Sequence, residues 1–156
     1  MSTLQKLLSI TVVFLFLVTG CASVPMESIE STAKAKAFNQ PTENKAGIYV
    51  YRKDTHFGAA IKKNVYVDQE CIGETAKGVF FYHEVDGDKD YTLATESEFS
   101  PNDLTVSMKS GMLYFFEQYM KMGVFVGGAG IDQKSEAIGK EALTELNMAT
   151  KGHCSV

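Results

Sequence analysis

GIYVYRK, residues 47–53, decides how the fold of this 156-residue chain begins. Four β-branched or aromatic side chains lie between Gly47 and Arg52, a pattern typical of a β-strand. Similar stretches follow at spacings of about ten residues, divided by turn residues, which indicates a sandwich or an open barrel. The further expected strands are 64–68, 71–75, 79–85, 91–98, 104–109 and 112–120.

Two of these stretches predict a hairpin with its turn near Asp68–Glu70. LTVSMK, residues 104–109, alternates apolar and polar side chains and therefore predicts a half-buried strand. MLYFFEQYM, residues 112–120, begins apolar on both faces, so another element should cover it.

The expected cover is an amphipathic helix within residues 135–149, where Ile138, Ala142 and Leu146 recur every four residues. We therefore predict a mainly β fold, a sandwich-like antiparallel sheet domain of about seven strands with one C-terminal amphipathic helix. This domain should cover residues 46–150, and residues 151–156 should form a tail.

The charge of the chain argues against nucleic acid as a partner. The net charge is −4, and Arg52 is the only arginine. Arginine is the residue best suited to forked phosphate contacts, and phosphate contacts supply much of the affinity for nucleic acids.

The N-terminus has the features of a signal peptide, here residues 1–20. Lys6 precedes an apolar run, Leu7–Val18, that is too short for a membrane span of roughly 20 residues. The next residues, ending in Gly20 and Cys21, complete a VTGC sequence that resembles the bacterial lipobox. That resemblance implies cleavage between Gly20 and Cys21 and acylation of Cys21. The alternative is a plain secretory signal or a short membrane anchor with an incidental cysteine.

An acylated Cys21 would tie the mature protein to a membrane. Three acyl chains, at about 0.8 kcal/mol per buried methylene, hold a protein for practical purposes permanently. Ala22 follows the cysteine where an inner-membrane retention signal would have Asp, which by analogy favours the outer membrane with the domain in the periplasm. Residues 21–45 are polar and contain two prolines, and predict a flexible tether that reaches roughly 25 to 30 Å.

The other two cysteines, Cys71 and Cys154, are an even number in an oxidising compartment. They predict a disulfide that attaches the C-terminal tail to the second hairpin strand. Two separate thiols, with Cys154 on a frayed end, are the alternative.

The sequence predicts no catalytic residue, metal site or cofactor. Its three histidines, His56, His83 and His153, lack the spacing of metal ligands. The acidic turn 86–90 resembles the start of a calcium loop but lacks the glycine and the final glutamate of one, so a polar hairpin turn is expected.

GVFVGGAG, residues 123–130, lacks the Gly-Lys-Ser/Thr of a phosphate loop, so we expect a mobile connection before the helix. Its three central apolar residues, 124–126, fit either core positions or an exposed patch that meets a partner or the bilayer.

One candidate binding site lies on the first strand. Tyr49, Tyr51 and Arg52 could place aromatic faces beside a guanidinium and recognise an acidic or sugar-bearing envelope ligand. The alternative is that the tyrosines pack in the core and the arginine pairs with an acidic residue.

The order of strands and turns resembles a known family. AGIYVYR, VYVDQECIGE, GVFFYHEV, YTLATESE and LTVSMKSGMLYFFEQ, followed by a late helix, resemble the domain of unknown function 2846 family of bacterial lipoproteins over roughly residues 46–147. The resemblance implies an envelope lipoprotein with a β-rich domain and no established activity.

We therefore expect a membrane-anchored, non-catalytic binding or structural module with an envelope protein as its possible partner. A receptor for a small envelope ligand, a sugar or an acidic metabolite, is the alternative, and it predicts an apolar pocket between sheet and helix with a few convergent polar groups. An enzyme would require a cluster of titratable residues that the sequence does not show.

Overall fold

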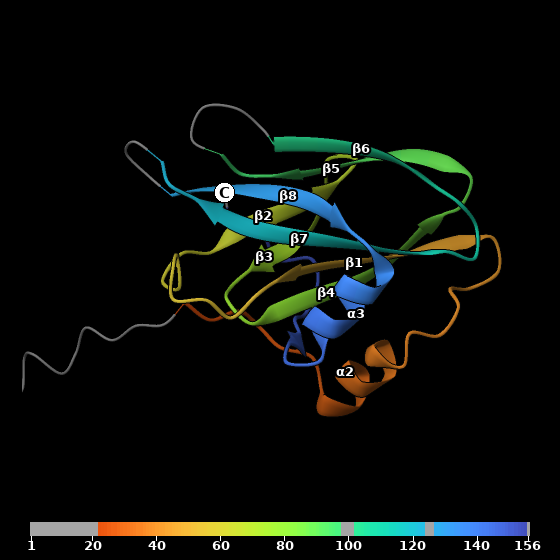
Figure 1. Cartoon of the computed structure of the whole chain (residues 1–156), viewed down its shortest axis with the longest axis horizontal. Helices are drawn as coiled ribbons and strands as arrows, with labels where there is room; N and C mark the ends of the chain where they lie inside the picture. Colours follow the sequence, from red (N-terminus) through yellow and green to blue (C-terminus); the bar gives the residue numbers. More distant parts are fainter. Residues whose placement is uncertain (1–21, 98–101, 124–126, 156) are drawn as a thin grey trace, which may run out of the picture.

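The computed structural model describes residues 22–97, 102–123 and 127–155 and has two β-sheets and two short helices (Figure 1). The mainly β, sandwich-like class predicted from the sequence is confirmed. The described residues contain nine strands, two more than expected, and one extra helix. The elements are α2 (Ile29–Lys36), β1 (Lys45–Arg52), β2 (Lys63–Val67), β3 (Glu70–Thr75), β4 (Val79–Asp86), β5 (Lys89–Thr95), β6 (Asn102–Met108), β7 (Leu113–Lys121), β8 (Gly128–Lys134), α3 (Glu136–Leu143) and β9 (Asn147–Met148).

The strands form a five-stranded sheet in the order β8-β7-β1-β4-β9 and a four-stranded sheet in the order β3-β2-β5-β6. Most neighbouring strands are antiparallel, as expected. Two pairs are parallel instead, β1 with β7 and β4 with β9. Long connections separate the members of each parallel pair in the sequence, which is how a chain can return to a sheet in the same direction.

The predicted hairpin is confirmed as β2 and β3. Asp68 and Gln69 both have positive φ angles, 47° and 68°, as the tight turns that match the twist of paired strands require. The side chain of Asp68 also accepts a 2.8 Å hydrogen bond from the amide of Thr92 on the neighbouring β5. The turn is therefore held to the sheet although it contains no glycine.

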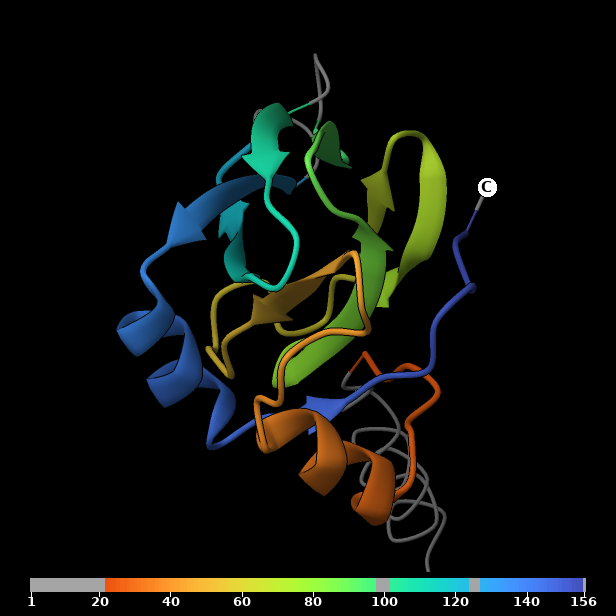
Figure 2. The ribbon, with the colours of Figure 1, turned by 90° about the vertical axis from the view of Figure 1, so that its right-hand side faces the viewer.

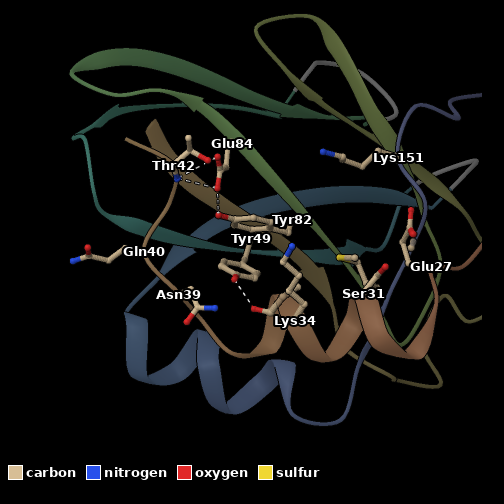
Figure 3. A pocket seen from close by; sticks show the side chains of 13 residues that line it. Glu27, Ser31, Lys34, Asn39, Gln40, Thr42, Tyr49, Tyr82, Glu84 and Lys151 are labelled. Carbon is tan, nitrogen blue, oxygen red and sulfur yellow. Dashed lines mark hydrogen bonds between the residues drawn. The ribbon is translucent and has the colours of Figure 1, made fainter. Parts of the chain in front are cut away.

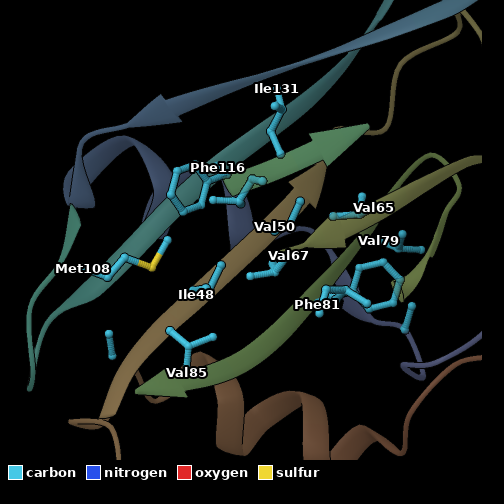
Figure 4. Packing of buried hydrophobic residues seen from close by; sticks show 14 residues of the cluster. Ile48, Val50, Val65, Val67, Val79, Phe81, Val85, Met108, Phe116 and Ile131 are labelled. Atoms are coloured by element: carbon cyan, nitrogen blue, oxygen red, sulfur yellow. The ribbon is translucent and has the colours of Figure 1, made fainter. Parts of the chain in front are cut away.

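The main core lies between the two sheets (Figure 4). From β1, Ile48 and Val50 point into it, because alternate residues of a strand face opposite sides of the sheet. The four-stranded sheet contributes Val65, Val67 and Leu93, each at most 3% exposed.

A second apolar layer covers the other face of the five-stranded sheet, where Tyr49, Phe80 and Phe115 pack against α2 and α3. Both helices lie on the same side of the sheets (Figure 2). The C-terminal helix is shorter than predicted, and Gly139 and Leu143 are its buried residues. Ile138, expected in the buried stripe, is 51% exposed. Gly139 instead packs directly against Phe115, and a side chain would not fit there because a Cβ would lie 2.3 Å from Cγ of Phe115.

Much of the expected flexible tether is structured. Residues from Pro25 onward pair with the end of the chain: the amide of Thr150 donates to the carbonyl of Pro25, and the amide of Glu27 donates to the carbonyl of Met148, both at 2.9 Å. Helix α2 then begins after its N-cap Ser28. The sequence pattern missed this packing because only two apolar side chains of the segment, Ala35 and Phe38, pack on the second apolar layer, and backbone hydrogen bonds supply the rest.

The glycine-rich segment is a strand in part. Gly128, Ala129 and Gly130 belong to β8 and pair with the end of β7, where we expected a mobile connection. A side chain at Gly130 would collide with Tyr119, which explains the residue type. Residues 124–126 lie outside the described residues.

Candidate functional site

The predicted site on β1 does not form an exposed surface. Tyr49, Tyr51 and Arg52 are each at most 2% exposed, because β1 lies inside the sheet and both of its faces are covered. The two tyrosines face the helices, whereas Arg52 faces the other side of the strand. These three residues therefore do not form one exposed binding surface, and the tyrosines pack as the alternative predicted.

Arg52 binds carbonyl groups and not the acidic partner that we expected. Its Nη1 donates to the carbonyl of Ile61 at 2.7 Å, and its Nη2 donates to the carbonyl of Gly58 at 2.5 Å. Burial lowers the pKa of the guanidinium. This side chain therefore fixes the connection between β1 and β2, while its buried Nε has no hydrogen-bond partner among the described residues.

The remaining sequence candidates are placed as follows. Cys71 on β3 and Cys154 in the tail are joined by a disulfide with Cα atoms 6.2 Å apart. Gly20 and Cys21, the predicted cleavage and lipidation positions, lie outside the described residues. His56 and His153 are exposed, whereas His83 is half-buried. Burial and the charge of Lys151 lower the pKa of His83.

The acidic turn after β4 gives each carboxylate a separate partner. Asp86 pairs with Lys45 and Lys89, both at 2.7 Å, and Asp88 accepts a 2.8 Å hydrogen bond from the hydroxyl of Ser110. Asp88 has a φ of 59°, as in a tight turn. Across the described residues, no group of three or more acidic, histidine or cysteine side chains could hold a metal ion.

A cavity of about 580 Å³ lies between α2 and the five-stranded sheet (Figure 3). Its floor contains the rings of Tyr49 and Tyr82, whose centroids are 4.7 Å apart. Ala35 of α2 and Met148 of β9 add apolar surface. The hydroxyl of Tyr49 is turned away to the carbonyl of Ala35, to which it donates at 2.7 Å. The floor is therefore largely aromatic and apolar.

One carboxylate is fixed inside this cavity. Glu84 accepts a 2.7 Å hydrogen bond from the hydroxyl of Tyr82 and two longer ones, 3.3 and 3.4 Å, from the amide of Thr42. Burial by itself would raise the pKa of Glu84, but these hydrogen bonds outweigh it, so its pKa is lowered. Burial and the adjacent carboxylate raise the pKa of Tyr82. At neutral pH the site therefore holds a fixed anion beside a neutral phenol.

Two lysines stand at the rim of the cavity. The side chain of Lys34 extends from α2 toward the two tyrosine rings, and Lys151 lies on the C-terminal tail (Figure 3). Within the described part of the chain neither ammonium group has an ion pair at up to 4.0 Å. These cations are therefore available to an acidic group.

Sequence reasoning missed this cavity. Its residues come mainly from α2, the connection between α2 and β1, the strands β1, β4 and β9, and the segment after β9. The pairing of the N- and C-terminal segments brings them together. One signal was present: Tyr82 and Glu84 occur two residues apart in VFFYHEV, residues 79–85, so they share a face of that strand. The position of α2 had no comparable signal.

Sequence reasoning also missed a buried polar network between the sheets. Gln118 of β7 is 1% exposed and donates a 2.6 Å hydrogen bond to the hydroxyl of Thr95, while its carbonyl accepts from Thr75. Thr95 in turn donates to the carbonyl of Asn64 at 2.9 Å. The residues joined by these hydrogen bonds lie inside the sandwich. The network therefore stabilises the fold and offers no binding site that is open to a ligand.

No helix among the described residues has the length and apolar character needed to cross a membrane. The family model described as "Protein of unknown function (DUF2846)" matches residues 42–129. A protein of Haemophilus influenzae, strain Rd, named only "Uncharacterized protein", is 47% identical over 133 residues, which are 85% of this chain and 78% of the relative. No solved structure matches the chain.

Proposed function

The chain belongs to the DUF2846 family of proteins of unknown function, and we propose that it is a lipid-anchored envelope protein that acts by binding and not by catalysis. The observation that carries the anchor is the sequence at the N-terminus, where an apolar run of signal-peptide length ends in VTGC, residues 18–21. The domain would face the periplasm, from the outer membrane, because Ala22 stands where an inner-membrane retention signal would have Asp.

The anchor is tested by labelling cells with radioactive palmitate. The native protein takes up the label, and Cys21→Ser does not, because only the thiol of Cys21 follows the cleavage site. The control is the double variant Cys71→Ser/Cys154→Ser, which keeps Cys21 and keeps the label. Label retained by Cys21→Ser would overturn the proposal.

A binding role is supported by how the polar groups of the domain are used. Glu84 is held as an anion by Tyr82 and Thr42, which suits it to fix geometry and not to exchange protons near neutral pH. The partner test is crosslinking in living cells followed by mass spectrometry, with the native protein and Cys21→Ser compared. A protein captured only by the anchored form supports a tethered interaction module; capture of the same protein by both forms would show that the anchor is not needed for the encounter.

The second candidate function is a receptor for a small envelope ligand, and the cavity under α2 favours it. Its volume falls within the range of roughly 300–1,000 Å³ typical of small-molecule sites, and its aromatic floor with a few polar groups is the usual composition. The ring of Tyr82 suits stacking against a sugar, and Lys34 suits a carboxylate or phosphate.

This candidate is tested by the thermal shift of the protein in the presence of envelope sugars and acidic metabolites, since a ligand of the folded state stabilises it by mass action. For an acidic ligand, Lys34→Gln should weaken binding by roughly tenfold, the equivalent of one charge-assisted hydrogen bond. Lys109→Gln, an exposed lysine outside the cavity, is the matched control. Equal affinity of the two variants would exclude Lys34 from the site.

A further inference from the structure

The folded domain begins very close to the proposed lipid. Pro25 is already fixed by its hydrogen bond from Thr150, so only residues 22–24 separate Cys21 from the domain. Four residue steps of at most about 3.6 Å let Pro25 lie no more than about 14 Å from the acylated residue. The surface around Pro25 is therefore held at the membrane and cannot move freely above it.

Two large apolar side chains are exposed at this point. Ile29, the first residue of α2, is 90% exposed, and Met26 is 45% exposed. Further along the same helix, Thr32 and Ala35 are buried against the domain. Ile29 and Met26 therefore lie exposed on the segment that leads from α2 toward Cys21.

We infer that Met26 and Ile29 lie in the headgroup layer of the membrane beside the lipid anchor, so that the domain rests on the bilayer through the first turn of α2. The inference rests on the proposed lipid anchor. The bilayer is the partner of this surface because the short linker, residues 22–24, keeps Met26 and Ile29 close to the membrane at a high effective concentration. Burial of the two side chains in the interfacial layer then sets the orientation of the domain.

The charges on this segment fix the depth of the contact. Glu27 directly follows Met26, and Glu30 directly follows Ile29. A carboxylate is costly to bury in the hydrocarbon core, so these two residues keep the contact in the hydrated headgroup layer. The mature domain is also acidic overall, since removal of residues 1–20 takes away Lys6 and no acidic residue and leaves a net charge of −5. Attraction to anionic lipid therefore does not explain the contact; the acyl chains bring the domain to the surface, and the apolar side chains orient it.

The chain contains no tryptophan, which allows a direct test. Ile29→Trp introduces a single tryptophan, which can be excited apart from the tyrosines, and the acylated variant is reconstituted into phosphatidylcholine vesicles. The emission of the tryptophan should shift to the blue when the protein is in the vesicles. It should lose intensity when the lipids carry bromine near the headgroup end of their chains, and lose less when the bromine is near the chain terminus. The matched control is Met112→Trp, at a residue that is 50% exposed before β7 and is separated from the β9 edge by β1 and β4.

The outcomes separate the inference from the proposed function on which it rests. Mass spectrometry of the N-terminal peptide first establishes acylation of Cys21, and its absence would overturn the proposed function and the inference with it. In acylated protein, quenching of Ile29→Trp beyond that of Met112→Trp supports the inference. Equal quenching of the two variants would overturn the inference and leave the anchor intact.

Discussion

The hydroxyl of Tyr82 donates a 2.7 Å hydrogen bond to Oε1 of Glu84, two residues further along the same strand. Because alternate residues of β4 face the same side, both groups lie in the cavity under α2. This pair is the most specific polar arrangement in the cavity, since the carboxylate also receives the amide of Thr42. The carboxylate of Glu84 therefore joins β4 to the segment that precedes β1.

Tyr82→Phe should make the protein less stable by about 1 kcal/mol at neutral pH, at the low end for a bond to a charged group because Glu84 is partly exposed. The lowered pKa of Glu84 means that the folded state favours the ionised form. This contribution is fully present above the ordinary carboxyl pKa and is lost as the pH falls from there through the lowered pKa of Glu84. In the variant the pKa of Glu84 should rise toward its usual value. Carboxyl NMR titration together with urea unfolding at neutral and acidic pH checks both expectations; an unchanged pKa would contradict them.

Arg52→Lys should release the connection between β1 and β2. A lysine cannot reproduce the forked contact to the carbonyls of Gly58 and Ile61, so we expect a loss of about 2 kcal/mol. Hydrogen exchange should become faster for residues 58–61. Lys53→Ala, an exposed neighbour that pairs with Glu117, is the control and should change stability by less than about 1 kcal/mol.

Removal of the disulfide between Cys71 and Cys154 should destabilise the domain by about 2 to 5 kcal/mol, because the bond closes a long loop in the unfolded chain. Cys71→Ser, Cys154→Ser and the double variant should have similar denaturation midpoints, since each removes the same bond. Reductant should lower the midpoint of the native protein and leave the three variants unchanged. A native midpoint that is insensitive to reductant would argue against the bond.

Gly139→Ala should destabilise the protein although alanine is the better helix former. In an exposed helix this change is worth about 1 kcal/mol of stability, but here the new methyl group would meet the ring of Phe115. We expect a net loss of about 1 to 3 kcal/mol from overpacking. Ile138→Ala, at the exposed neighbouring position, should have little effect, and thermal unfolding of the two variants gives the comparison.

The strands were predictable because their signal is local. β-branched and aromatic runs bounded by turn residues mark β1 to β7 in the sequence, and the hairpin of β2 and β3 was placed correctly. Strand β8 was not, because its start, Gly128 to Gly130, lacks the side chains that favour strands and is held by pairing with β7. The parallel pairs of the five-stranded sheet also depend on contacts between distant segments, which no local pattern records.

The sequence predicted the type of the candidate site but not its position in the fold. A pocket between sheet and helix was the expectation for a small-ligand receptor, yet of the three residues chosen from the sequence on β1 only Tyr49 lines the cavity. Tyr49 and Arg52 drew attention as an aromatic and a cation close together, but neighbours on a central strand face opposite sides and both are buried. The cavity instead needs α2, whose weak apolar pattern predicted a flexible segment.

The pairing of the chain ends has a mechanical consequence. A pull on an anchored Cys21 would pass first to the hydrogen bonds of Pro25 and Glu27 with β9 and the segment after it. That segment is secured at both ends, by backbone hydrogen bonds to β4 and by the bond from Cys154 to Cys71. Force from the proposed anchor would thus be shared between the two sheets, and the C-terminal segment cannot be pulled off the domain without breaking the disulfide.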